Sequence, residues 1–151
     1  MKKKTKKHND KVLECLVNAH AEAWSVGSHV GEQTSKSTQV TELWQSKVEA
    51  IDKRRFRKEF AVLDEFPKKY RIDVVDLKRK IAYELKASKN NPQHEFYKDI
   101  FKVALANRDS KRFNKLYFCV VKSAKSSLGL LSEFAEAESI KLGFEVEIHY
   151  F

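Results

Sequence analysis

Residues 70–88 read Tyr-Arg-Ile-Asp-Val-Val-Asp-Leu-Lys-Arg-Lys-Ile-Ala-Tyr-Glu-Leu-Lys-Ala-Ser, and this stretch decides the fold of the chain. Its two apolar runs predict two β-strands joined by a tight basic turn, namely Ile72, Val74, Val75 and Leu77, then Ile81, Tyr83, Leu85 and Ala87. Polar side chains interrupt both strands: Asp73 lies in the first, and Glu84 and Lys86 lie in the second. Glu84 and Lys86 are two residues apart, so they project from one face of their strand.

The geometry of a hairpin also places Asp73, because residues that lie opposite each other in antiparallel strands point to the same face. A turn at 78–79 sets Asp73 opposite Glu84, and a turn two residues longer sets it opposite Lys86. Either register puts all three side chains on one face, whereas a turn of odd length or a bulge would not. Asp76 has the other parity, so we prefer Asp73 as the acid that partners Glu84.

Two carboxylates held close together on rigid strands repel each other unless a cation lies between them. A hard divalent cation such as Mg²⁺ prefers oxygen ligands of this kind. A lysine beside the pair can hold a water molecule whose pKa the metal lowers. The pattern therefore predicts metal-assisted hydrolysis of a phosphodiester.

The same residues resemble a known family. Ile72-Asp73, ten further residues and then Glu84-Leu85-Lys86 resemble the active site of the PD-(D/E)xK nuclease superfamily, the fold of most type II restriction endonucleases, with Ile72 in place of the family proline. The resemblance implies that Asp73 and Glu84 bind Mg²⁺ and that the backbone carbonyl of Leu85 completes the metal site. It implies that Lys86 positions the attacking water.

Members of this family often place one more acid from a helix near the metal. Glu14, Glu42 and Glu49 lie in predicted helices, and the sequence does not choose between them. An acid two residues before a lysine is itself common here, since Asp76–Lys78 and Asp109–Lys111 share the spacing. Only Glu84–Lys86 lies inside a predicted strand beside an acid of the neighbouring strand. The alternative is a solvated strand face that carries a Glu–Lys pair.

Composition bounds the remaining possibilities. The chain has 151 residues and 42% hydrophobic residues, which predicts a flexible basic arm at 1–9 followed by a single domain at 10–151. No apolar run approaches the roughly 20 residues that span a bilayer, and no secretory signal follows the basic start, so we expect a cytoplasmic protein without a membrane partner. Cys15 and Cys119 are interpreted as reduced core residues.

The net charge of +9 favours a polyanionic partner, and double-stranded DNA is the one we expect. The basic residues are clustered, and three of the four clusters flank the predicted hairpin. The clusters are Lys2-Lys3-Lys4 with Lys6-Lys7, Lys53-Arg54-Arg55 with Arg57-Lys58, Lys68-Lys69, and Lys78-Arg79-Lys80.

Hydrophobic periodicity gives the rest of the fold. Helices are predicted at 10–25, 39–53, 92–106 and 128–142, strands at 57–65, 116–121 and 144–151, and a loop at 26–38. The resulting order ααβββαβαβ predicts an α/β protein with a restriction endonuclease-like mixed β-sheet flanked by helices.

The sequence also predicts which residues of the last two helices form a cap, an outer face and an inward stripe. Asn91 is expected to cap the 92–106 helix ahead of Pro92, and Lys98 and Lys102 are expected on its outer face. The inward stripe predicted for the last helix is Leu130, Leu131, Phe134, Ala137 and Ile140.

These observations lead to the hypothesis of a Mg²⁺-dependent DNA endonuclease, most simply a type II restriction-type enzyme. Cutting both strands needs two active sites, so a homodimer is expected. A junction resolvase or DNA repair nuclease of the same fold remains an alternative. A non-catalytic basic module that binds nucleic acid is the alternative from another class.

Overall fold

The order of elements predicted from the sequence is confirmed. The computed structural model describes residues 10–25 and 33–151, so the predicted arm at 1–9 and the 26–32 part of the predicted loop lie outside the described residues. The elements are α1 (Lys11–Ser25), α2 (Gln33–Ile51), β1 (Phe56–Ala61), β2 (Arg71–Asp76), β3 (Ile81–Lys86), α3 (Pro92–Ala106), β4 (Lys115–Val120), a 3₁₀ turn (Lys122–Ala124), α4 (Lys125–Leu142) and β5 (Glu145–Tyr150).

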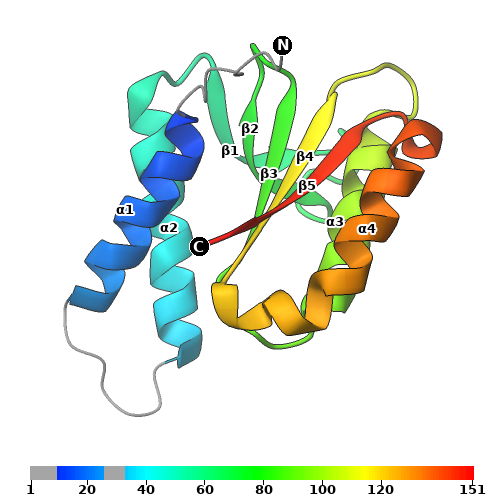
Figure 1. The fold of residues 1–151 in the computed structure, drawn as a ribbon. Coiled ribbons are helices and arrows are strands. Elements are labelled where there is room, and N and C mark those ends of the chain that lie inside the picture. The colour runs from blue at the N-terminus through cyan, green and yellow to red at the C-terminus, as the bar shows by residue number, and fades with distance from the viewer. Residues whose placement is uncertain (1–9, 26–32) are drawn as a thin grey trace, which may run out of the picture.

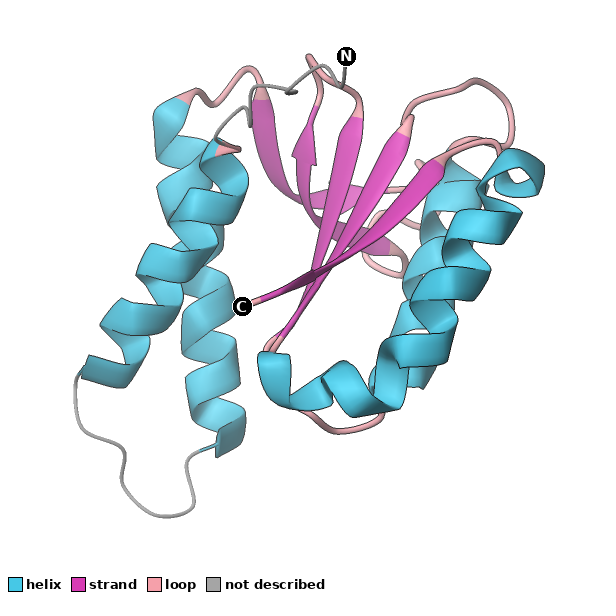
Figure 2. Ribbon diagram, in the orientation of Figure 1, coloured by secondary structure: helices cyan, strands magenta, loops and turns pink. Residues whose placement is uncertain are grey.

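The strands form one open, mixed, five-stranded sheet in the order β1-β2-β3-β4-β5. The first three strands form an antiparallel meander, and β4 and β5 then add in parallel, each after a crossover helix. Helices α1 and α2 cover one face of the sheet, and α3 and α4 cover the other (Figures 1 and 2). The chain is therefore an α/β protein whose β3 is covered on both faces.

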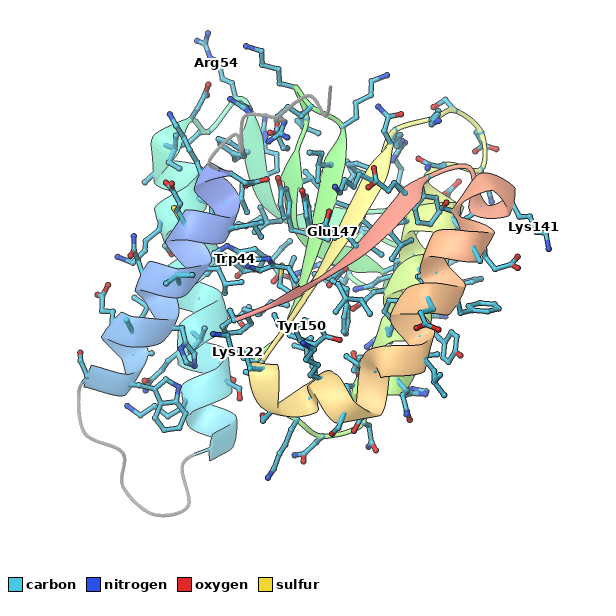
Figure 3. All side chains as sticks on the ribbon, viewed as in Figure 1. Trp44, Arg54, Lys122, Lys141, Glu147 and Tyr150 are labelled. Carbon is cyan, nitrogen blue, oxygen red and sulfur yellow. The ribbon has the colours of Figure 1, made fainter. Side chains whose placement is uncertain are left out.

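Each face of the sheet has its own apolar core. Under α1 and α2, the fully buried Trp44 is fixed by its indole N–H, which donates to Val12 O at 3.0 Å. Figure 3 shows this side chain between the helices and the sheet. Under α3 and α4, Phe96 meets Phe118 of β4 edge to face, with ring centroids 5.3 Å apart. These two cores hold the central strands rigidly in place.

The predicted start of the second helix is wrong. Helix α2 begins at Gln33, so residues 33–38 of the predicted loop are helical. Lys36 is 4% exposed and its Nζ donates to Ala23 O at 3.0 Å, which ties the first turns of α2 to the end of α1. A tertiary contact thus extends a helix through a polar segment that has little apolar periodicity of its own.

The starts of α3 and α4 differ in detail from the prediction. Pro92 is the first residue of α3 as predicted, but Asn91 has φ 47° and its side chain makes no capping hydrogen bond. The inward stripe predicted for α4 is wrong for Leu130, which is 84% exposed, and for Phe134, which is 53% exposed, whereas Leu131 packs against the core as predicted. The helix begins three residues earlier than expected, and Leu128 and Ala135 face the sheet together with Leu131 and with Ala124 of the preceding 3₁₀ turn.

The parity argument about Asp76 is confirmed. This carboxylate accepts hydrogen bonds from Arg55 Nε at 3.0 Å and Nη2 at 2.8 Å. It also accepts the backbone N–H groups of Lys78 and Arg79, each at 3.1 Å. Asp76 therefore fixes the β2–β3 turn to the start of β1 and contributes nothing to the region of Glu84.

We expect Asp76→Asn to lower the free energy of unfolding by about 3 kcal/mol at pH 7, because it leaves the Arg55 guanidinium without its charged partner. Burial alone would raise the pKa of Asp76, but Arg55 and the Arg79 N–H outweigh it and lower the pKa. The stabilisation is therefore present above the unfolded pKa of about 3.9 and is lost as pH falls through the folded pKa.

Urea unfolding at pH 7 and near pH 3 measures this difference. The gap between the variant and the wild type should narrow at the acidic pH, and an equal gap at both values would contradict the assignment. Asp109→Asn is the matched control, because Asp109 lies in an exposed pair with Arg108 and should leave stability unchanged at both pH values.

Candidate active site

The hairpin adopts the first of the two predicted registers. Val74, Val75 and Asp76 pair with Tyr83, Ala82 and Ile81, which leaves a four-residue turn at 77–80. Continued by one residue, this register sets Asp73 opposite Glu84. Backbone pairing stops at Val74. Beyond it, the N–H of Leu85 donates to the side chain of Asp73, at 2.9 Å from Oδ2. The carboxylate of Asp73 thus takes the place of a backbone acceptor at the point where β2 and β3 separate.

The alternation of side chains breaks at this same point. Ile72 packs among residues of α3 and α4, whereas Val74 packs among residues of α1 and α2. In β1, Phe56 and Phe60 likewise pack on opposite faces, and Glu59 between them has φ 48°. A non-glycine residue in this left-handed region is uncommon and is concentrated at functional or strained sites. The two strands therefore change face together, at the level of Asp73.

Gln45 of α2 fixes this irregularity. Its side chain is only 5% exposed, and its Nε2 donates to Glu59 Oε1 at 2.8 Å and to Asp73 O at 3.1 Å. One buried amide thus ties the helix to both strands where their face changes. Such a fully bonded polar contact specifies one arrangement of the backbone.

Glu84 lies under α3 and not in open solvent. It is 3% exposed, and its Oε1 lies 2.5 Å from Lys102 Nζ. The same ammonium lies 2.9 Å from Asp99 Oδ1 and donates to Arg71 O at 2.8 Å. The prediction that Lys98 and Lys102 share an outer face is therefore wrong for Lys102, which is 7% exposed.

The buried carboxyls outnumber the ammonium among them. Burial raises the pKa of Glu84 well above its ordinary value, and the charge of Asp73 raises it further. Burial also raises the pKa of Asp99, to about 6, against the opposing charge of Lys102. The pKa of Asp73 is raised by burial too, although the N–H of Leu85 opposes the shift. For Lys102, burial alone would lower the pKa, but Glu84 and Asp99 outweigh it and raise the pKa.

The charges of these groups are unevenly balanced. Glu84 and Asp99 share the single ammonium of Lys102, and Asp73 lies near enough to raise the pKa of Glu84 further, so ionisation of all three acids at once is disfavoured. The buried Oε1 of Glu84 makes no well-formed hydrogen bond, although it lies against Lys102. Lys102 is therefore the group that offsets the charge of this buried carboxylate.

Lys86 lines a cavity of about 740 Å³ at the end of β3, between the first turns of α2 and of α3. Leu85 lines this cavity as well, and Asp73 and Glu84 do not. Of the three helix acids that the sequence offered, Glu42 lines this cavity, whereas Glu14 and Glu49 do not. The charged residues lining the cavity are Glu42, Glu59, Glu95, Lys58 and Lys86.

The structure thus brings Asp73 and Glu84 close together, as predicted. Lys86 was expected to join them on one face, and it lines a cavity that neither acid lines. Sequence reasoning missed Gln45, Asp99 and Lys102. Asp99 occupies an inward position of α3, between Phe96 and Val103 of the apolar stripe. An acid at such a position is a signal that the sequence contained.

Comparison with known proteins identifies no relative: no family model, curated protein or solved structure matches this chain. In the described parts of the chain, no group of three or more His, Cys, Asp or Glu residues is arranged to hold a metal ion. Residues 10–25 and 33–151 also contain no helix with the length and apolar character needed to cross a membrane.

Proposed function

We propose that this protein is a Mg²⁺-dependent DNA endonuclease with a restriction endonuclease-like fold. One observation carries the proposal: Asp73 and Glu84 lie opposite each other where β2 and β3 separate, beside a cavity that contains Lys86. Two acids and a lysine at this point of an antiparallel pair match the chemistry of phosphodiester hydrolysis. The meander followed by a crossover helix and a parallel strand supports the fold assignment.

The donors that this proposal offers to a divalent metal are two carboxylates and one backbone carbonyl. Asp73, Glu84 and the carbonyl of Leu85 would hold it, and Glu42 lines the neighbouring cavity. When bound, Mg²⁺ supplies a Lewis acid that lowers the pKa of bound water and offsets charge on the phosphate. Lys102 holds the carboxyls of Glu84 and Asp99 together, so it limits the repulsion between buried acids in the free protein.

The role proposed for Lys86, holding a water and a phosphate oxygen, depends on the cavity that it lines. Its amine lies in a space large enough to admit a phosphate group, and an ammonium there donates hydrogen bonds to a water and to a phosphate oxygen. The carboxylates of Glu42, Glu59 and Glu95 around the same space repel a phosphodiester. Binding of the substrate in this cavity therefore depends on a cation, which agrees with a metal-dependent reaction.

A second function is favoured by a specific observation. Glu84 is 3% exposed and is paired with Lys102, which is also how a purely structural acid would lie. The chain would then be a basic module that binds nucleic acid without cutting it. A restriction-type enzyme, a junction resolvase and a repair nuclease differ in their substrates and in the dimer that we expect each to need.

Incubation with supercoiled plasmid separates these functions. We expect nicking and linearisation with Mg²⁺ and none with EDTA. Lys86→Ala should lower the rate at least 100-fold, the range of a lost proton-transfer or water-positioning group. Lys89→Ala, an exposed lysine just beyond the cavity, is the control and should cut normally.

A wild type that shifts the plasmid on a gel but leaves it intact with Mg²⁺ would establish the binding module instead. Discrete bands from a linear genome would support restriction. Cutting confined to four-way junctions or damaged duplexes would support resolution or repair.

A further inference from the structure

Three segments that are distant in sequence meet at the turn end of the sheet, the end opposite the cavity. The N–H of Leu77 donates to Arg55 O at 2.9 Å, which joins the β2–β3 turn to the α2–β1 connection. Asp10 joins the start of α1 to the β2–β3 hairpin, because it accepts the Tyr83 hydroxyl at 2.8 Å and lies 3.4 Å from Arg79 Nη1. These contacts form a fixed platform and not three independent loops.

The platform carries a dense set of exposed cations, which we call the turn-end basic surface: Lys11, Lys53, Arg54, Lys78, Arg79 and Lys80. Arg54 extends outward at the top of the molecule in Figure 3. Among the residues that the structure describes, this region also has three carboxylates, fewer than its cations: Asp52 accepts the N–H of Arg54, and Asp10 and Asp76 are occupied by helix capping and by the β2–β3 turn. A cavity of about 220 Å³ lies between Asp10 and Asp76, lined by Lys11, Arg55 and Arg79 among others. The outward charge of this end is therefore strongly positive.

This surface lies far from the cavity that contains Lys86. Strand β3 begins directly after Lys80 and ends at Lys86, so the two lysines are about 20 Å apart at a strand rise of roughly 3.3 Å per residue. That separation equals about six base pairs of duplex DNA at roughly 3.4 Å each. Lys58 of β1 lines the cavity and lies two residues after Phe56, which starts the strand at the turn end. Lys58 therefore adds a positive charge on the side of the cavity that leads toward the turn-end basic surface.

We propose that the turn-end basic surface binds the phosphate backbone of duplex DNA, about six base pairs from the phosphodiester that enters the cavity. The choice of DNA rests on the proposed function, whereas the surface and its position rest on the contacts above. Fixed lysines at a turn contact phosphates without reading bases, so this surface positions the duplex and adds affinity without sequence preference. Asp76 and Arg55 hold the turn in place before DNA arrives, which lowers the cost of ordering on binding.

The test compares two double variants. Lys78→Gln/Lys80→Gln removes two turn cations and leaves Arg79 bonded to Asp10. Lys125→Gln/Lys141→Gln removes two exposed cations from α4 and is the matched control. Binding of a fluorescent duplex is measured by anisotropy in EDTA, from about 50 to 200 mM salt.

We expect the slope of log affinity against log salt to become shallower by between about 1 and 2 units in the turn variant and to stay unchanged in the α4 control. Equal slopes in wild type and turn variant would overturn the proposal. A turn variant that binds the duplex normally but loses binding to vesicles of anionic lipid would also overturn it. Because these measurements exclude metal, a wild type that shows this slope but never cuts would refute the nuclease and leave the surface assignment standing.

Discussion

Asp73→Asn is expected to reduce Mg²⁺-dependent plasmid cleavage by about 1,000-fold or more, since losing a metal-ligand charge removes several kcal/mol of transition-state stabilisation. The fold should persist, because the asparagine oxygen can still accept the N–H of Leu85. Cleavage rates at saturating Mg²⁺, with circular dichroism of the same sample, measure both expectations. Loss of cleavage without loss of structure would assign a functional role to the charge itself.

Asp64→Asn is the matched control, since Asp64 lies exposed in the β1–β2 connection and should leave cleavage unchanged. Full activity of the Asp73 variant would remove the aspartate from the metal site. Raising the Mg²⁺ concentration should rescue the Asp73 variant only weakly, because an amide is a poorer ligand for a hard cation than a carboxylate.

The second large effect concerns stability. Lys102→Met should lower the free energy of unfolding by about 3 to 5 kcal/mol, the cost of leaving a buried partner charge uncompensated. Glu84 and Asp99 would both lose the ammonium that holds them, at 2.5 and 2.9 Å in the native protein. A fall in the melting temperature of about 10 °C is the corresponding thermal effect. Calorimetry or urea unfolding at neutral pH measures it.

Lys98→Met on the same helix is the control. Lys98 is exposed and pairs only with Glu95 on the surface, so its loss should change stability by less than about 0.5 kcal/mol. Similar losses in the two variants would show that Lys102 is not the counter-ion of the buried acids. Added Mg²⁺ that restores part of the melting temperature of the Lys102 variant would indicate that a divalent cation can replace the ammonium.

The hairpin could be read from the sequence because its information is local. The apolar runs and the basic turn place Asp73 on the same face as Glu84 in either of two registers, and parity separates Asp76 from them. The order of elements followed for the same reason, since each helix and strand has its own period. The change of face at Glu59 and Asp73 could not be read, because it depends on a positive φ and on Gln45 reaching across from α2.

The misassigned faces share one physical cause. Helix α4 offers two stripes with the same helical spacing, and only packing against the sheet selects the one that contains Leu128 and Ala135. The sequence predicts a surface position for Lys102, since a lysine is almost never buried unless it is paired. Its partners Glu84 and Asp99 come from a strand and from its own helix, so the pairing becomes visible only when α3 is placed over the sheet.

The hydrogen bond from Leu85 to Asp73 has one more consequence. In most of a sheet, an amide proton exchanges with solvent only when neighbouring strands come apart. The amide of Leu85 is held by a side chain, so a rotation of Asp73 is enough to release it. Its magnetic resonance frequency and its exchange rate therefore follow the charge and the ligands of that one carboxylate, and this single amide reports on the site without any added label.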